Sequence, residues 1–223
     1  MKIYVIIPAG GKGLRSGSAT PKQYLKFKGK ELVVYTLETF QKNKLISEII
    51  ISAEPAYFGL LTKLKKKYKL TKLKTIVKGG KKRQDSVYNG LKSLDAKKND
   101  LIIVHDAARP LLPGDILTNA IKTATTKGNA LVCVKAGDTI IKGTNTVEDY
   151  IDRNNVCYVQ TPQIFRYFDL KMAMQKAFDD NFYGTDESVL IKRIGKSINI
   201  VEGSFLNFKI TTKADFKVLK KLI

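Results

Sequence analysis

Short apolar runs alternate with longer amphipathic stretches along most of the chain. The run at residues 3–7 is uninterrupted and rich in β-branched side chains, which is typical of a strand buried on both faces of a parallel sheet. Further strands are predicted at residues 46–52, 73–77, 101–104, 130–134 and 198–201. Helices are predicted at residues 31–42, 55–68, 83–94, 116–126, 169–178 and 215–222, and another opens at residues 185–187. This alternation predicts an α/β fold with a mostly parallel central sheet and flanking crossover helices.

Residues 137–153 interrupt this rhythm. Polar and apolar side chains alternate loosely about a turn at residues 143–145, as they do in a β-hairpin. The stretch is too polar for the central core, so we expect an arm at about residues 137–156 that leaves an otherwise single domain spanning residues 1–223. An exposed two-stranded ribbon needs a partner to be stable, which predicts a dimer.

Three glycines within four residues, Gly10, Gly11 and Gly13, lie just after the first strand. Glycine has no side chain to keep the backbone away from a ligand, so such a turn can direct several N–H groups at a phosphate. The glycines alone fit an ordinary strand-to-helix turn equally well. Arg15 and Lys22 add two cations to the same loop and favour a site that binds a polyphosphate.

Two known nucleotide-binding motifs fit this loop less well. A Walker A motif needs Gly-x-x-x-x-Gly-Lys followed by Ser or Thr, and the loop contains no such sequence. The dinucleotide fingerprint is matched at Gly11 and Gly13, but Ser16 stands where the third glycine is expected. A partial match of this kind is a weak signal.

A second group of polar residues follows the strand at 101–104. Ligands of open α/β sheets bind outside the carboxyl ends of the strands, so Asp106 is placed to meet a magnesium-bound phosphate, a ribose or a second substrate. The structural alternatives are a turn or helix cap for Asp106 and an ion pair with it for Arg109. Two charged groups at the mouth of this strand favour a functional site. We assign His105 to packing or to a backbone hydrogen bond.

Composition narrows the functional classes. The chain has 223 residues, 24.9 kDa of mass and 43% hydrophobic content, which suits one α/β domain. Its single histidine removes most metallohydrolase and serine-hydrolase interpretations. Cys133 and Cys157 lie in apolar contexts and are predicted to be buried thiols rather than a disulfide. The first apolar run is too short for a signal peptide and no run approaches membrane-spanning length, so we expect a cytoplasmic protein without a membrane partner.

The formal net charge is +20, which raises the hypothesis of a nucleic-acid partner. Most of the cations are lysines scattered along helix faces such as residues 61–68, without interleaved aromatic residues or a nucleic-acid-binding motif. We therefore predict solvated lysine-rich surfaces and no nucleic-acid partner. Small phosphorylated substrates would gain from the same positive field.

Ordered motifs extend over nearly the whole chain: Pro8-Ala9-Gly10-Gly11-x-Gly13-x-Arg15, Pro21-Lys22-Gln23-Tyr24, Asp85-Ser86-Val87, His105-Asp106-Ala107-Ala108-Arg109-Pro110, Asp138-Thr139, Asp152-Arg153-Asn154, Gln160-Thr161-Pro162-Gln163, Thr185-Asp186-Glu187 and Asn207-x-Lys209-Ile210-Thr211. Together they resemble the 2-C-methyl-D-erythritol 4-phosphate cytidylyltransferase family. The resemblance implies a Rossmann-like nucleotide-diphospho-sugar transferase fold and a homodimer joined by β-arms. It also implies cytidylyl transfer from CTP to 2-C-methyl-D-erythritol 4-phosphate, with Mg²⁺ or another divalent cation, in the non-mevalonate isoprenoid pathway.

The resemblance also implies roles for individual residues. The catalytic cations would be Arg15, Lys22 and Lys209. The nucleotide site would comprise Pro8, Ala9, Gly10, Gly11, Gly13, Gly80, Ser86 and Ala108. The polyol phosphate would meet Asp106, Arg109, Thr139 and Arg153, the last two from the neighbour's arm. No metal ligand is assigned, because Mg²⁺ is expected to bind mainly through the CTP phosphates, with Asp106 as the one candidate contact.

Two positions depart from the family pattern. Ser16 stands where the family often has methionine, and Lys81 stands where an acidic residue is common. The second departure puts one cytidine or ribose contact in doubt.

The implied reaction needs cations more than a base. The substrate phosphate attacks the α-phosphorus of CTP in line, and the negatively charged transition state is stabilised by neutralisation and positioning, without a covalent intermediate. The alternative within this reaction type is a ribitol 5-phosphate cytidylyltransferase, which shares the glycine-rich loop and the motif at 160–163. The alternative of another class is a non-catalytic phosphate- or nucleic-acid-binding module. The motifs at 152–154 and 185–187 favour the methylerythritol enzyme, and charged residues gathered at strand ends argue against the module.

Overall fold

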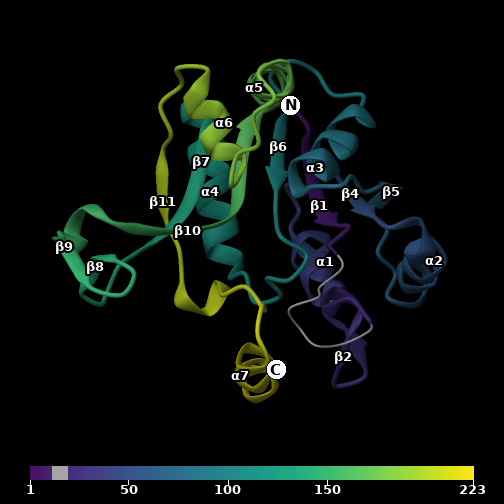
Figure 1. The fold of residues 1–223 in the computed structure, drawn as a ribbon. Helices are drawn as coiled ribbons and strands as arrows, with labels where there is room; N and C mark the ends of the chain where they lie inside the picture. The colour runs from purple at the N-terminus through teal and green to yellow at the C-terminus, as the bar shows by residue number, and fades with distance from the viewer. Residues whose placement is uncertain (12–19) are drawn as a thin grey trace.

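The computed structural model describes residues 1–11 and 20–223, and its fold is shown in Figure 1. Among these residues, one seven-stranded sheet has the order β11, β7, β10, β6, β1, β4, β5. Its strands are β1 (Ile3–Ala9), β4 (Glu48–Ala53), β5 (Leu73–Lys78), β6 (Leu101–Val104), β7 (Asn129–Lys135), β10 (Cys157–Arg166) and β11 (Ile200–Glu202). β1 pairs in parallel with β4 on one side and β6 on the other. The prediction of a mostly parallel central sheet is confirmed.

Helices cover both faces of this sheet. They are α1 (Leu32–Lys42), α2 (Phe58–Lys67), α3 (Arg83–Lys92), α4 (Gly114–Lys127), α5 (Tyr167–Asp179) and α6 (Glu187–Arg193), while α7 (Lys213–Leu222) lies near the C-terminus. α1, α2 and α4 pack with Val5 and Ile7 on one face, whereas α3, α5 and α6 pack with Tyr4 and Ile6 on the other. Successive strand residues point to opposite faces, so an uninterrupted apolar run requires two covered faces. Among the described residues, no helix combines the length and the apolar character that crossing a bilayer needs.

The sequence analysis missed β10, which is ten residues long and runs antiparallel between β6 and β7. The four polar or cyclic residues at 160–163 break the apolar pattern in the middle of this strand. Gln163 is nevertheless fully buried, and its Oε1 accepts a hydrogen bond from the Ser188 N–H at 3.0 Å. The alternation of strand and crossover helix is interrupted here, as expected for the arm, because the segment from 136 to 156, not a helix, joins β7 to β10.

Smaller differences concern element boundaries. β11 begins at Ile200, two residues later than expected, and pairs in parallel with β7. A 3₁₀ turn at Pro55–Tyr57 precedes α2, which therefore begins at Phe58. The two-residue strands β2 (Lys26–Phe27) and β3 (Lys30–Glu31) form a ribbon that is too short to leave a periodic pattern in the sequence.

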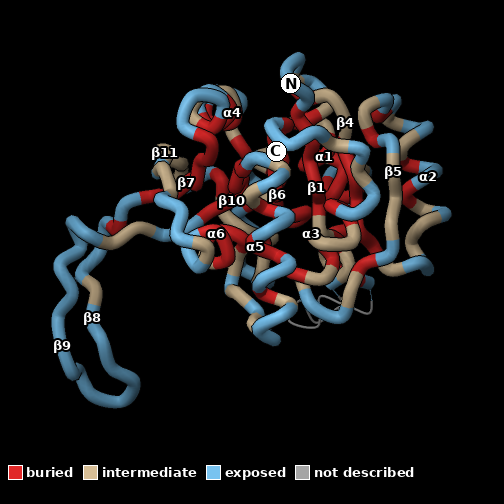
Figure 2. The backbone as a smooth tube through the Cα atoms, turned by 90° about the horizontal axis from the view of Figure 1, so that it is seen from above, coloured by how far each residue is buried: buried red, intermediate tan, exposed pale blue. Residues whose placement is uncertain are grey.

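The arm forms a hairpin that stands apart from the rest of the molecule (Figure 2). β8 (Ile140–Gly143) pairs antiparallel with β9 (Val147–Ile151), as the sequence pattern predicts. Its apolar side chains are exposed, with Val147 at 52% and Tyr150 at 69% of full exposure. Apolar surface of this kind on a protruding ribbon is typical of a contact with another protein surface.

The two cysteines are free thiols on the neighbouring strands β7 and β10. Cys133 is buried, and burial raises the pKa of its thiol to about 11. Cys157 is only half-buried. The expectation of two buried thiols is therefore right for Cys133 and wrong for Cys157, which lies where β10 leaves the exposed arm.

Two helical glycines allow a matched test of how closely α3 packs on the sheet. A Cβ at Gly90 would lie 2.7 Å from Ile6 Cγ2, a fully buried methyl group, whereas a Cβ at Gly59 on α2 would meet nothing within 4 Å. We expect Gly90→Ala to lower the free energy of unfolding by about 1–3 kcal/mol through overpacking. Gly59→Ala should raise it by about 0.5 kcal/mol through helix propensity. Urea unfolding of both variants measures the difference, and equal stabilities would contradict the close packing of α3.

Candidate functional site

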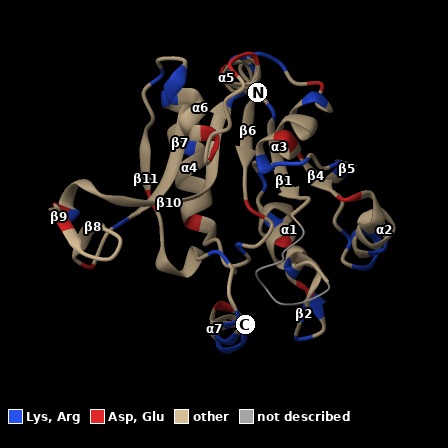
Figure 3. Cartoon of the chain, viewed as in Figure 1, with Lys and Arg blue, Asp and Glu red and all other residues tan. Residues whose placement is uncertain are grey.

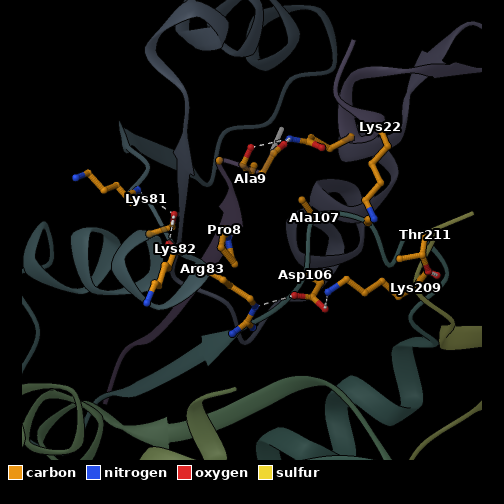
Figure 4. Close-up of a pocket in the computed structure, with 16 residues that line it drawn as sticks. Pro8, Ala9, Lys22, Lys81, Lys82, Arg83, Asp106, Ala107, Lys209 and Thr211 are labelled. Atoms are coloured by element: carbon orange, nitrogen blue, oxygen red, sulfur yellow. Dashed lines mark hydrogen bonds and ion pairs between the residues drawn. The ribbon is translucent and has the colours of Figure 1, made fainter. Parts of the chain in front are cut away.

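A pocket opens at the carboxyl ends of β1, β5 and β6. Its volume is about 480 Å³, and it is lined by Pro8–Gly11 at the end of β1, Gly80–Arg83 after β5, Asp106–Ala108 after β6, and by Lys22, Gln23, Ser86, Lys209 and Thr211. Figure 4 shows Asp106 between Arg83 and Lys209. Parallel strands end at the same edge, which explains how segments far apart in the sequence meet here.

Most of the residues proposed from the sequence meet in this pocket. Lining residues among them are Pro8, Ala9, Gly10, Gly11, Lys22, Gly80, Ser86, Asp106, Ala108 and Lys209. Arg109 lies directly behind, with its Nε 3.4 Å from Asp106 Oδ2. Gly13, Arg15 and Ser16 lie outside the described residues. Thr139 and Arg153 do not line the pocket of their own chain, and both are exposed on the arm.

Glycines allow the turn after β1 and the turn after β5 to approach each other beside the pocket. A Cβ at Gly79 would lie 3.2 Å from Gly10 Cα, and a Cβ at Gly80 would overlap Asp85. The N–H of Gly80 donates to Ser86 Oγ at 3.0 Å. Only residues without a side chain allow backbone this close to backbone. The turns that follow β1 and β5 therefore pack against each other along one side of the pocket.

Gln23 fixes the start of the glycine-rich loop. Its Nε2 donates to the carbonyl oxygens of Ala9 at 2.7 Å and Gly11 at 3.0 Å. Gln23 is buried within the 3₁₀ turn Lys22–Tyr24, whose Tyr24 ring stacks on Tyr57. Because that turn also carries Lys22, one hydrogen-bonded unit sets the position of both the loop backbone and the lysine.

Asp106 is the charge centre of the pocket. It is 6% exposed, and Arg83 Nε lies 3.1 Å from its Oδ1 while Lys209 Nζ lies 2.9 Å from its Oδ2. Burial raises the pKa of this carboxyl, but Arg83, Lys209 and Arg109 outweigh it and hold the pKa far below its ordinary value. Asp106 is therefore ionised at any physiological pH. The structural ion pair considered for Arg109 does form, alongside two other cations.

His105 serves the fold rather than the chemistry, as predicted. Its ring packs edge-on against Phe40 at 5.1 Å, and burial lowers its pKa to about 4. Nε2 donates to the Arg109 carbonyl oxygen at 3.1 Å, which leaves Nδ1 to accept from the Thr161 hydroxyl at 3.1 Å. Thr161 Oγ1 in turn accepts the N–H of Asp106 at 3.1 Å. The neutral imidazole thus orients the turn that carries Asp106.

The C-terminal segment 207–211 forms another wall of the pocket. Lys22 Nζ donates to the Ile210 carbonyl oxygen at 2.6 Å, and the Ile210 N–H donates to the Ala108 carbonyl at 2.9 Å. Arg109 Nη1 donates to the Asn207 carbonyl at 2.6 Å. These contacts hold Lys209 over Asp106, so a lysine that alone would be taken for a surface residue lies within the pocket.

Two charged residues of this network escaped the sequence analysis as functional candidates. Arg83 Nη1 donates to both carboxylate oxygens of Glu187, at 2.7 and 2.8 Å, across 104 positions of sequence. Burial lowers the pKa of the Arg83 guanidinium, but Glu187 and Asp106 outweigh it and raise the pKa above its ordinary value. The available signals were Arg83 at the start of a predicted helix and Glu187 in the motif at 185–187. Neither pattern says that the two residues meet.

The described residues do not form a metal cage. No group of three or more His, Cys, Asp or Glu side chains that could hold an ion occurs among them. Asp106 is the one acidic side chain among the described residues that line the pocket, and both its oxygens already face cations. The donor set therefore suits an anionic ligand, and a divalent metal would have to take most of its ligands from that anion.

The chemistry available here is neutralisation and positioning. Lys22, Lys209 and Arg83 bring positive charge to a pocket whose glycine turns expose backbone. Ser86 Oγ accepts from Gly80 and donates to the Lys82 carbonyl at 3.2 Å, so it has no adjacent base to make it a nucleophile. Among the described lining residues, the arrangement suits a reaction between phosphates, where the attacking group is itself an anion.

Comparison with known proteins gives one consistent answer. The profile of the IspD family, 2-C-methyl-D-erythritol 4-phosphate cytidylyltransferase, matches residues 3–223. The Clostridioides difficile protein of that name is 39% identical over 223 residues, covering 98% of this chain and 92% of the relative. The Clostridium botulinum (strain Langeland) protein is 40% identical, covering 98% and 97%. The solved Francisella tularensis structure of the same name has a TM-score of 0.84, 31% identity and full coverage of both chains. This chain therefore belongs to the IspD family.

Proposed function

We propose that this chain transfers the cytidylyl group of CTP to 2-C-methyl-D-erythritol 4-phosphate in the pocket at the ends of β1, β5 and β6. The products are 4-diphosphocytidyl-2-C-methyl-D-erythritol and pyrophosphate. This reaction is a step of isoprenoid biosynthesis. The chain is a cytidylyltransferase by its family. The observation that supports this site is that the family's motif residues, drawn from opposite ends of the chain, line one cation-rich pocket.

The nucleotide is proposed to bind in the pocket against the two glycine turns. Backbone N–H groups at Gly10 and Gly11 would meet phosphate oxygens, together with Gly13 and Arg15 of the loop. Pro8, Ala9, Gly80, Ser86 and Ala108 line the part of the pocket that would enclose the cytidine. The lack of side chains at Gly10 and Gly79 lets ligand atoms approach the backbone closely, and the choice of a cytosine base rests on the family.

Catalysis is proposed to rest on Arg15, Lys22 and Lys209. The phosphate of the polyol attacks the α-phosphorus in line, a new P–O bond forms as the bond to pyrophosphate breaks, and no proton needs to be removed from the nucleophile. Lys22 and Lys209 approach the pocket from different elements, which suits them to neutralise two different anions. The divalent ion, Mg²⁺ by proposal, screens phosphate charge when it is bound.

The polyol phosphate is proposed to lie between Asp106, Arg109 and the arm of a second copy. Thr139 and Arg153 are exposed and are not among the residues that line the pocket of their own chain, which is compatible with a contact in the pocket of a partner. The exposed apolar side chains of the arm support a homodimer.

We further propose that the chain forms one domain over residues 1–223, lies in the cytoplasm and has no nucleic-acid partner. Figure 3 shows Lys and Arg residues concentrated on α2, α7 and the β2 ribbon, at the periphery.

Nucleotide choice tests the proposed nucleotide site. CTP should support pyrophosphate release at least about a hundred-fold better than ATP or GTP at equal concentration, because the segments at 8–11 and 80–86 are proposed to enclose a pyrimidine and a purine adds a second ring. The assay uses 2-C-methyl-D-erythritol 4-phosphate as acceptor and ribitol 5-phosphate in parallel. Equal turnover of ATP and CTP would contradict the proposed site, and preference for ribitol 5-phosphate would select the rival acceptor.

Lys22 tests the proposed role of cations. Lys22→Ala should lower kcat by roughly a hundred-fold, because a phosphate-facing cation is removed from the transition state. The melting temperature should fall by about 2–4 °C, since the substitution removes the part-buried hydrogen bond to Ile210. Lys63→Ala, which removes an exposed lysine from α2, is the matched control and should match the parent. Unchanged kcat in Lys22→Ala would mean that Lys22 has no role in the reaction.

Complementation tests the arm. If each site joins one subunit's loop to the other subunit's arm, Lys22→Ala and Arg153→Ala chains should each be nearly inactive alone and regain activity when refolded together. One site of the mixed dimer carries both defects, and the other carries neither. Each variant refolded alone is the control. If mixed dimers confirmed by mass show no recovery of pyrophosphate release, Arg153 acts in its own chain or has no substrate role.

A further inference from the structure

A row of alternating charges leads from the pocket into the protein. Lys209, Asp106 and Arg83 line the pocket in this order, and Glu187 at the start of α6 ends the row. Glu187 is 1% exposed and is not among the residues that line the pocket. It therefore has no direct access to a ligand, and any effect it has on the reaction must pass through Arg83.

Glu187 determines how Arg83 presents its donors to Asp106. With Nη1 paired to both oxygens of Glu187, Arg83 offers Asp106 a single bond, from Nε to Oδ1 at 3.1 Å. Oδ2 is left for Lys209 at 2.9 Å and for Arg109 at 3.4 Å. Among the described residues, Arg83 Nη2 is buried without a hydrogen-bond partner. Nε and Nη2 form the fork that arginine ordinarily places on both oxygens of one carboxylate.

The anchorage of Glu187 is rigid. The side chain of Asp186 caps α6 by accepting the N–H of Val189 at 3.1 Å. The preceding N–H, that of Ser188, donates to the fully buried Gln163 of β10 at 3.0 Å. Leu190 and Ile191 then bury the helix against the sheet. A carboxylate fixed in this way can hold a guanidinium at a set angle.

We propose that Glu187 is a positioning residue that, through Arg83, reserves one oxygen of Asp106 for Lys209 and so sets the position of the Lys209 ammonium group in the pocket. Without Glu187, Arg83 is free to turn its fork onto both oxygens of Asp106 and to displace Lys209. The inference rests on the proposed function, in which Lys209 meets the reacting phosphates. Displacement of a positioned cation by about 1 Å costs up to roughly a hundred-fold in rate.

A double-mutant cycle tests this inference. Glu187→Gln keeps the size of the side chain and removes its charge, and kcat/KM for 2-C-methyl-D-erythritol 4-phosphate at saturating CTP should fall roughly ten- to hundred-fold. Lys209→Met should lower the same quantity, and the double variant should be no worse than Lys209→Met alone, because Glu187 acts through Lys209. The dissociation constant of CTP should stay within about twofold of the parent in Glu187→Gln, since the glycine turns are untouched.

The neighbouring carboxylate provides the matched control. Asp186→Asn removes a charge one position away, keeps a side chain able to cap α6 and leaves Arg83 with its partner, so its kcat/KM should equal that of the parent. Arg83→Lys is the second variant, used if Glu187→Gln does not fold, and it should show the same loss and the same lack of additivity with Lys209→Met.

The outcomes separate the two proposals. If the parent protein releases no pyrophosphate from CTP with the polyol phosphate, the proposed function is wrong. If the parent is active and folded Glu187→Gln matches it, only the positioning role is wrong. Losses that multiply in the double variant, or a CTP dissociation constant that rises in parallel, would mean that Glu187 supports the fold in general and does not act through Lys209.

Discussion

The pocket depends on one buried carboxylate in a chain with twice as many basic as acidic side chains, 40 against 20. Arg83, Arg109 and Lys209 would repel one another at the same sheet edge without a negative charge between them. Asp106 has an oxygen within 3.4 Å of each. Removing one member of such a buried set is costly, because the others keep charges that water no longer solvates. With Glu187 included, three cations face two carboxylates, and one net positive charge remains for incoming phosphate.

The position of Asp106 is set by β10, the antiparallel strand in an otherwise parallel sheet. β10 runs antiparallel beside β6, and its Thr161 hydroxyl accepts the Asp106 N–H and donates to His105. Asn207 donates to the Thr161 carbonyl at 2.7 Å, which brings the segment carrying Lys209 to the same place. The residues at 160–163 are therefore not apolar, although they lie within a core strand. Their hydrogen bonds join β6, β10 and the C-terminal segment.

Particular residues show what the sequence could and could not predict. The buried strand at 3–7, the glycines at 10 and 79–80 and the hairpin at 140–151 are local features, because propensity and turn chemistry act over a few residues. β10 was missed because the residues at its centre are polar and form tertiary hydrogen bonds, so apolar and polar side chains do not alternate there with the two-residue period of a strand. The pairing of Arg83 with Glu187 was missed because 104 residues separate them and no local pattern reports the contact. Lys209 entered the site through family motifs alone, since its own neighbourhood is that of a surface lysine.

The pocket, too, combines features that are local in the sequence with contacts between distant residues. The proposed nucleotide side is built from the turns that follow β1 and β5, whose glycines form short motifs that can be recognised in the sequence. The proposed acceptor side is built from β6, the segment at 207–211, the start of α3 and the buried start of α6, and every one of these joins through a long-range charge or hydrogen bond. A triphosphate site can therefore be proposed from short motifs. In the proposed function, discrimination between one polyol phosphate and another would depend on where Lys209 and Arg109 are held, which only the folded arrangement of four separate segments determines.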